Sequence, residues 1–133
     1  MAPAVDFGEW AAPSLELTLG GSAYMVPPPS VEDAKKLLAM AVRAEVRLGI
    51  VKGKVPDDVE AVLATIPRDE HPALGPVFAQ LVDDGVPQPT IDRMAYYATF
   101  YWARGKGYAD ALARILWGPV EAEEAEAGDA PKG

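Results

Sequence analysis

His71 is the only histidine in this chain of 133 residues, and histidine is the side chain best suited to proton transfer near neutral pH. A serine hydrolase would need this imidazole beside Ser14, Ser22 or Ser30, together with an acid that orients the ring. All three serines lie in or beside a segment typical of a β-hairpin, and such a coincidence is rare. We therefore expect His71, which precedes Pro72, to help cap a helix.

Three short groups that contain adjacent acidic side chains are candidate metal sites, and none has the spacing of one. Asp69, Glu70 and His71 are adjacent, whereas metal ligands usually lie one helical turn apart or across a turn. Asp57-Asp58 fall at a predicted helix start, where the helix dipole favours negative charge. Asp83-Asp84 fall at a predicted helix end, where the dipole is unfavourable, so we expect these two carboxylates to be solvated.

Two further kinds of site have no candidate residues. No glycine has the strand–loop–helix context with a following Lys-Ser/Thr that phosphate-binding loops require. The chain has no cysteine, which excludes disulfides, thiol catalysis and cysteine-bound zinc and suits a cytosolic protein. We therefore predict that the protein is not an enzyme and that it holds no metal and no cofactor.

The net charge of −8 is divided between two parts of the chain. Residues 118–133 hold five acids and one lysine, a net charge of −4, and residues 1–117 carry the other −4. Nucleic acids and anionic membranes attract clustered Lys and Arg, so we expect no nucleic-acid and no membrane partner. No apolar stretch approaches the length of about 18 residues that a membrane span needs, and no signal peptide opens the chain.

Composition divides the chain into three parts. Residues 1–13 contain Pro and Gly breaks and should be irregular, with Phe7 and Trp10 packing back onto the body. Residues 14–117 should form a single helical domain that opens with a β-hairpin over 14–27, and the Ala/Glu-rich residues 118–133 should be a disordered acidic tail. The predicted fold class is mainly α with a small N-terminal β-hairpin (α+β), in which about five short helices pack as a compact bundle.

The hairpin follows from the alternation of Leu15, Leu17 and Leu19 with Glu16 and Thr18 before Gly20-Gly21, a two-residue turn that accepts positive φ. Pairing residue 19 with residue 22 gives one shared apolar face. That face comprises Leu15, Leu17, Leu19, Tyr24 and Val26. A lone hairpin is marginal in water, so it must pack on the helices or pair with another chain.

Apolar residues spaced three and four apart predict the helices. The ranges are 31–48 after the N-cap Ser30, 57–66, a third helix that Gly85 ends, 90–104, and 108–117 after breaks at Gly105 and Gly107. The third helix begins either near Pro72, with a kink at Pro76, or at Pro76 itself.

Each helix has a predicted apolar stripe. The first has Ala34, Leu37, Leu38, Ala41, Val42 and Val46 or Leu48; the second has Val59, Val62, Leu63 and Ile66; the third has Leu74, Val77, Phe78, Leu81 and Val82; the fourth has Ile91, Met94, Ala95, Ala98, Tyr101 and Trp102; and the fifth has Tyr108, Ala111, Leu112, Ile115 and Leu116.

Five aromatic residues fall within seven positions of the fourth helix: Tyr96, Tyr97, Phe100, Tyr101 and Trp102. One stripe needs only the last two of them, so the helix is apolar on more than one side. It is either a central core helix wrapped by the others or an aromatic surface that receives a partner helix.

The order of these elements resembles the tail assembly chaperones of long-tailed phages, in particular phages of actinobacteria. The resemblance rests on Phe7-Gly8-Glu9-Trp10, the hairpin LELTLGGSAYMVPPPS, the segment LGPVFAQLVDDGVP (74–87), the aromatic helix MAYYATFYW (94–102) and Leu116-Trp117. It spans residues 7–117, and its motifs are structural. The chain departs from the family pattern in the second helix, which is less acidic and which Pro67 and Pro72 separate from the third.

The resemblance implies a protein that acts in the host cytoplasm and is absent from the mature virion. It would bind the long, helical tape measure protein and keep it soluble while tail-tube subunits polymerise around it. Such genes commonly yield a longer form, through a programmed ribosomal frameshift, that recruits the tube subunits. This chain would be the shorter form, and codons for Ala130-Pro131-Lys132 can contain a suitable slippery heptamer, C CCA AAG. Codons for Lys52-Gly53-Lys54 and Arg104-Gly105-Lys106 can also contain one, so this signal is not unique.

A chaperone of this kind needs an apolar groove for a client helix. The residues predicted to line it are Leu74, Phe78, Tyr97, Phe100 and Tyr101. The free edge of the hairpin offers a route to a homo-oligomer. Two other classes stay open: a small virion structural adaptor, such as a head–tail connector component, and a regulatory or antitoxin-like protein-binding module.

Overall fold

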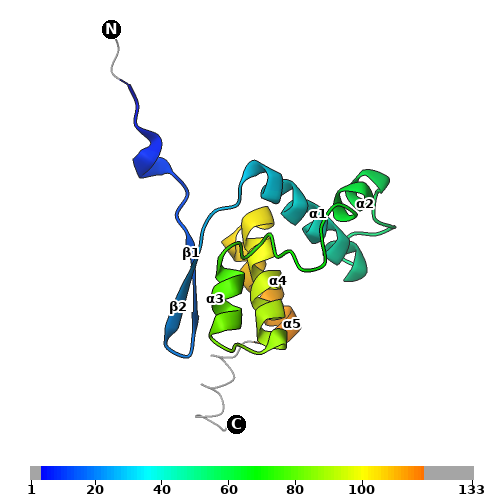
Figure 1. Ribbon diagram of the computed structural model, residues 1–133. Helices are drawn as coiled ribbons and strands as arrows, with labels where there is room; N and C mark the ends of the chain where they lie inside the picture. Colours follow the sequence, from blue (N-terminus) through cyan, green and yellow to red (C-terminus); the bar gives the residue numbers. More distant parts are fainter. Residues whose placement is uncertain (1–3, 119–133) are drawn as a thin grey trace, which may run out of the picture.

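A computed structural model describes residues 4–118, which contain five α-helices and a two-stranded antiparallel sheet (Figure 1). The elements in chain order are a 3₁₀ turn η1 (Phe7–Trp10), strands β1 (Leu15–Leu19) and β2 (Ser22–Val26), and helices α1 (Val31–Arg47), α2 (Asp57–Leu63), α3 (Val77–Asp83), α4 (Gln88–Arg104) and α5 (Lys106–Trp117). The fold is α+β and mainly helical, as predicted. The predicted acidic tail lies outside the described residues, apart from Gly118.

The hairpin has the predicted register, with Leu15 opposite Val26 and Leu17 opposite Tyr24. Its apolar face is buried only near the open end: Leu15, Tyr24 and Val26 belong to the core, whereas Leu19 is 37% exposed. The Tyr24 hydroxyl donates a 2.7 Å hydrogen bond to Asp84, just after α3. The hairpin is therefore tied to α3. Asp83 and Asp84 are exposed, as predicted, and Asp84 also accepts this hydrogen bond from the hairpin.

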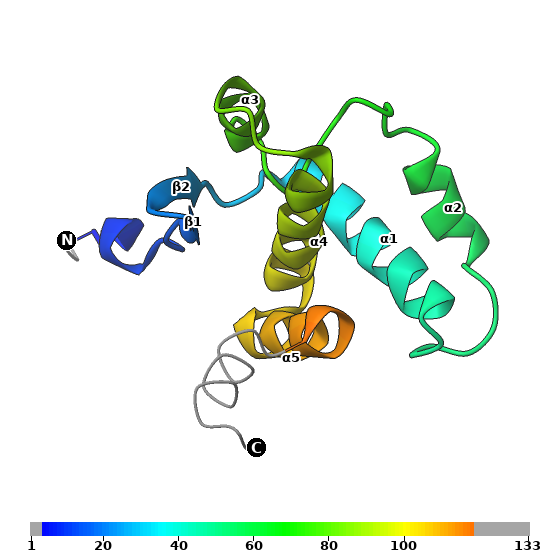
Figure 2. The same cartoon turned by 90° about the horizontal axis from the view of Figure 1, so that it is seen from below.

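The predicted packing of the N-terminal aromatics is also wrong. Phe7 and Trp10 are 67% and 68% exposed, and their rings stack edge to face on each other at 5.2 Å. Asp6 accepts a hydrogen bond from the backbone N–H of Gly8 and so holds the turn. Residues 5–10 project from the hairpin, away from the helices (Figures 1 and 2).

Helix α1 begins at the predicted N-cap, where the Ser30 hydroxyl accepts a hydrogen bond from the backbone N–H of Asp33. Its predicted stripe is partly wrong, because Leu38 is 47% exposed and Glu45 is buried instead. Helix α2 ends three residues earlier than predicted, and its stripe is half-buried against α1.

The start of α3 differs from both expectations. Pro76 is neither a kink nor the first residue of the helix; it is the N-cap, and α3 begins at Val77. The segment before it is a turn closed by the carbonyl of His71, which accepts hydrogen bonds from the N–H groups of Leu74 and Gly75. Gly85 ends the helix with φ of 75°, as predicted.

Helix α4 is the central element, and it packs on both α1 and α5 (Figure 2). Three consecutive residues, Ala98, Thr99 and Phe100, are buried. A helix buried on adjacent sides is wrapped by its neighbours, so the core-helix interpretation of the aromatic run is confirmed for this part of α4.

The predicted break at Gly107 is wrong, because α5 begins at Lys106 and includes this residue; Gly105 alone separates α4 from α5. The predicted α5 stripe is partly wrong: Ile115 is 78% exposed, Ala111 is also exposed, and Ala109 is buried. Within residues 4–118, no helix is long and apolar enough to span a membrane.

Candidate functional site

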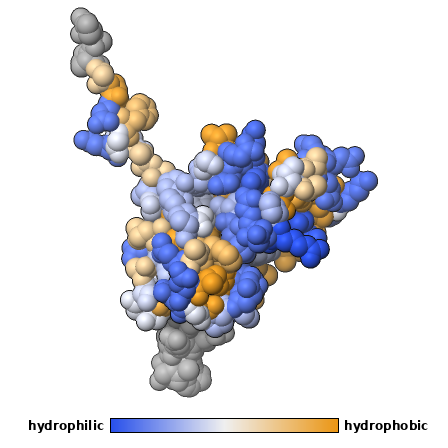
Figure 3. All heavy atoms as spheres, viewed as in Figure 1, coloured by the Kyte–Doolittle hydropathy of each residue, from blue (hydrophilic) through white to orange (hydrophobic). Residues whose placement is uncertain are grey.

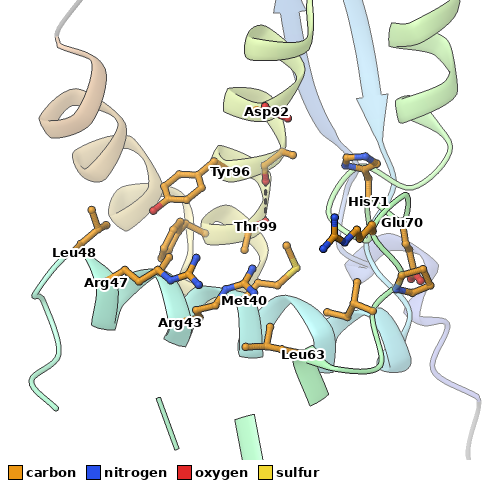
Figure 4. Close-up of a pocket in the computed structure, with 16 residues that line it drawn as sticks. Met40, Arg43, Arg47, Leu48, Leu63, Glu70, His71, Asp92, Tyr96 and Thr99 are labelled. Carbon is orange, nitrogen blue, oxygen red and sulfur yellow. Dashed lines mark hydrogen bonds between the residues drawn. The ribbon is translucent and has the colours of Figure 1, made fainter. Parts of the chain in front are cut away.

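A cleft of about 520 Å³ lies between α1, α2 and α4 and is closed on one side by the segment that follows α2 (Figure 4). Its size falls within the range of about 300–1,000 Å³ typical of ligand-binding pockets. Three elements from separate parts of the chain meet here because α1 contacts both α2 and α4.

The floor of the cleft is apolar. Met40 comes from α1, Leu63 from the end of α2, and Ala95 from α4. Phe100 lies deepest, with 1% of its surface exposed. Tyr96 stands at the edge, where burial raises the pKa of its hydroxyl. An apolar floor with aromatic edges suits the side chains of a partner protein.

The rim is basic, although the protein as a whole is acidic. Arg43 and Arg47 on α1 face Tyr96 and Thr99 on α4 (Figure 4), and Arg68 joins the rim from the segment after α2. Within residues 4–118, no carboxylate lies within 4.0 Å of any of these three arginines. Three guanidinium groups are therefore available to an acidic partner.

Two carboxylates also line the cleft, and each already has a neighbour. Glu70 accepts a 2.6 Å hydrogen bond from the Lys36 ammonium, which raises the pKa of Lys36. Asp92 accepts a 2.7 Å hydrogen bond from the amide of Gln88 on the same helix. Glu70 is paired with a cation, whereas Asp92 keeps its negative charge because an amide is neutral. The three rim arginines therefore outnumber the one uncompensated acid of the cleft.

His71 lines one end of the cleft, where its ring stacks on Phe78 with centroids 3.8 Å apart. Its backbone carbonyl, not its side chain, closes the turn before α3. No hydrogen bond within the described range joins His71 to a serine, and Ser30 is engaged as the α1 N-cap. The residues that the structure describes include no group of three metal-ligating side chains, so Asp69, Glu70 and His71 do not converge on one point.

The five residues predicted to bind a partner are not gathered in one open groove. Leu74 is fully buried in the core, and among the five only Phe100 lines the cleft. Phe78 is half-buried behind His71. Tyr97 and Tyr101 are half-buried; the Tyr97 hydroxyl donates a hydrogen bond to Asp110 on α5.

The arginine rim was missed by the sequence analysis. Arg43 and Arg47 are four residues apart, so their positions on one face of α1 could have been read from helical spacing. No local pattern places Arg68 beside them, because its position depends on the path of the chain between α2 and α3.

The comparisons with known proteins give a family and no further match. No curated protein and no solved structure matches this chain. The family described as a domain of unknown function, DUF7426, matches residues 5–132, which is nearly the whole chain and includes all of the elements described above. The chain belongs to the DUF7426 family.

Proposed function

We propose that this protein is a phage tail assembly chaperone that binds the tape measure protein and keeps it soluble during tail-tube assembly. The observation that carries the proposal is the cleft between α1, α2 and α4, with its apolar floor and its rim of Arg43, Arg47 and Arg68. An amphipathic helix binds by laying its apolar face into such a groove, and acidic residues beside that face would pair with the arginines.

The order of motifs described above also supports this function. The resemblance to tail assembly chaperones spans residues 7–117 and rests on several structural motifs in the same order. In this proposal the protein works in the host cytoplasm, is absent from the finished virion and reaches tail-tube subunits through a longer, frameshifted form. The heptamer proposed at residues 130–132 lies outside the described residues.

The expected affinity of each site is modest. A chaperone that tube subunits must displace cannot bind its client too tightly, and one cleft encloses only a short stretch of helix. Many copies on one long client would compensate, because linked sites raise the effective concentration of each next contact. The acidic character of the chain would limit aggregation of the loaded complexes.

Co-expression with the neighbouring long, helical open reading frame tests the proposal. The measurement is the soluble fraction of that client, with and without this protein, followed by co-purification. The cleft variant Arg47→Glu/Arg68→Glu changes two exposed side chains at the rim and should reduce client recovery at least tenfold.

A matched control is Lys35→Glu/Arg114→Glu, which makes the same change in net charge at exposed positions outside the cleft. It should leave client recovery unchanged. Equal loss in both variants would refute the cleft as the binding site, and an insoluble client in the presence of the unmodified protein would refute the chaperone function. Recovery of the protein in purified particles would support a head–tail adaptor instead.

A further inference from the structure

Residues 5–10 form an exposed arm whose side chains have no apolar neighbours in the body of the same chain. Val5, Phe7 and Trp10 are 65%, 67% and 68% exposed. Asp6 and Glu9 alternate with them, so the arm combines three large apolar groups with two negative charges. Figure 3 shows hydrophobic and hydrophilic residues side by side on this arm, clear of the main body.

The arm is preorganised. The Asp6 side chain accepts a 2.9 Å hydrogen bond from the backbone N–H of Gly8, and the rings of Phe7 and Trp10 contact each other at 87°. A segment that already holds its shape loses less conformational entropy on binding than a disordered one. Trp is among the residue types that contribute most of the binding energy at protein interfaces.

The cleft between α1, α2 and α4 has the complementary chemistry. Its floor is apolar, and its three rim arginines have no carboxylate within 4.0 Å in the part of the chain that the structure describes. We infer that the arm of one copy binds in the cleft of a second copy of this chain, with Phe7 and Trp10 on the apolar floor and with Asp6 and Glu9 facing the arginines.

The arm does not occupy the cleft of its own chain. It extends from the hairpin at one end of the molecule, whereas α2, which forms the outer wall of the cleft, lies at the other end with α1 and α4 between them (Figure 2). Only the four residues 11–14 join the arm to β1, and an extended chain of that length spans at most about 14 Å. Two copies that exchange arms reciprocally close as a dimer, whereas contacts that are not reciprocal are head-to-tail and propagate into a ring or a filament.

Sedimentation velocity over a range of concentrations tests the inference with the full chain and no client. The unmodified protein should self-associate as its concentration rises, and added salt should weaken the association. The arm variant Phe7→Ser/Trp10→Ser and the cleft variant Arg47→Glu/Arg68→Glu should each stay monomeric, with at least a tenfold loss of association. Both variants change exposed side chains, and circular dichroism checks that they remain folded.

An equal mixture of the two variants gives the decisive result. It contains one intact arm and one intact cleft for each pair of molecules, so it should form dimers and nothing larger. The control Lys35→Glu/Arg114→Glu should associate as the unmodified protein does.

Three results would overturn the inference. The first is an unmodified protein that is monomeric at every concentration. The second is a cleft variant that associates normally, which would point to pairing of hairpin edges instead. The third is a mixture of the two variants that stays monomeric. As a second measurement, a dye-labelled peptide of residues 1–13 should bind the arm variant and should bind the cleft variant at least tenfold more weakly.

The arm and the proposed client would compete for the same cleft. The inference nevertheless stands apart from the client's identity, because every measurement above omits the client. Failure of self-association would leave the solubility test of the chaperone function intact, and failure of that test would leave the sedimentation result intact.

Discussion

The Glu45 carboxylate on α1 accepts two hydrogen bonds from the guanidinium of Arg104 at the end of α4, at 2.8 and 3.0 Å. The Tyr108 hydroxyl on α5 donates a third, at 2.6 Å. Glu45 is only 4% exposed, and these bonds satisfy the charge that burial would otherwise make costly. One carboxylate therefore joins three helices at the end of α4.

The ion pair between Glu45 and Arg104 predicts that the protein loses stability in acid. The hydrogen bonds from Arg104 outweigh burial and lower the pKa of Glu45 below its usual value of 4.5. Because the native pKa is the lower one, the stabilisation is complete above pH 4.5 and disappears as the pH falls through the native pKa. Chemical denaturation at several pH values measures this effect.

The variant Glu45→Gln is the control for this prediction. It should lower the free energy of unfolding at neutral pH by about 1–3 kcal/mol, because Arg104 loses its counter-charge and because the Gln amide offers one acceptor oxygen where the carboxylate offers two. In this variant the free energy of unfolding should also fall less between neutral and acidic pH than it does in the unmodified protein. An unchanged acid profile in this variant would mean that other carboxylates are responsible.

Two half-buried tyrosines, Tyr97 and Tyr108, predict a second loss of stability, in alkali. Burial together with the hydrogen bond to Glu45 raises the pKa of Tyr108 to about 12, and burial also raises the pKa of Tyr97. A raised native pKa gives stability that is fully present below pH 10 and is lost as the pH rises toward 12.

Absorbance of tyrosinate against pH measures this directly. The native protein should ionise later than the chain in denaturant, and Tyr108→Phe should remove one late-titrating group. Identical native and denatured titration curves would contradict the burial of these hydroxyls.

Leu81 on α3 predicts a large packing effect. Its side chain is fully buried in the cluster that includes Leu74 and Val77, so Leu81→Ala should lower the free energy of unfolding by about 3 kcal/mol. The matched control is Ile115→Ala on α5, where the side chain is 78% exposed and the change should stay below about 0.5 kcal/mol. Equal losses in thermal or denaturant melts would show that Leu81 is not in the core.

Gly85 and Gly107 predict opposite signs for the same substitution. Gly85 has φ of 75°, so Gly85→Ala should cost about 1–2 kcal/mol of stability. Gly107 lies inside α5, and an added Cβ there would meet no atom within 4 Å. Gly107→Ala should therefore stabilise the protein by about 0.4–1 kcal/mol. The denaturant midpoints of the two variants measure these changes. A shift in the same direction for both would refute the prediction that backbone conformation sets the sign of the effect.

The sequence was sufficient for features that depend on near neighbours. Ser30 caps α1, Gly85 ends α3, and the two glycines of the hairpin turn fix its register. In each case the determining groups lie within a few residues of one another, so the rules of backbone geometry apply before any tertiary contact forms.

Tertiary structure decided which sides of the helices are buried. Leu38 is 47% exposed and Glu45 is 4% exposed, the reverse of what hydrophobicity indicates. The reason is that Glu45 accepts hydrogen bonds from Arg104 and Tyr108, which are 59 and 63 residues away in the sequence. A pattern along one helix carries no information about such partners.

The cleft and the arm show the same difference between features that local sequence determines and features that only tertiary structure determines. The types and spacing of Arg43, Arg47, Phe7 and Trp10 were visible in the sequence. Their combination was not, because the cleft exists only where α1, α2 and α4 meet and the arm is exposed because it projects from the hairpin, away from the helices (Figure 1). Local backbone preferences act over a few residues, whereas burial and exposure depend on surfaces that distant parts of the chain supply.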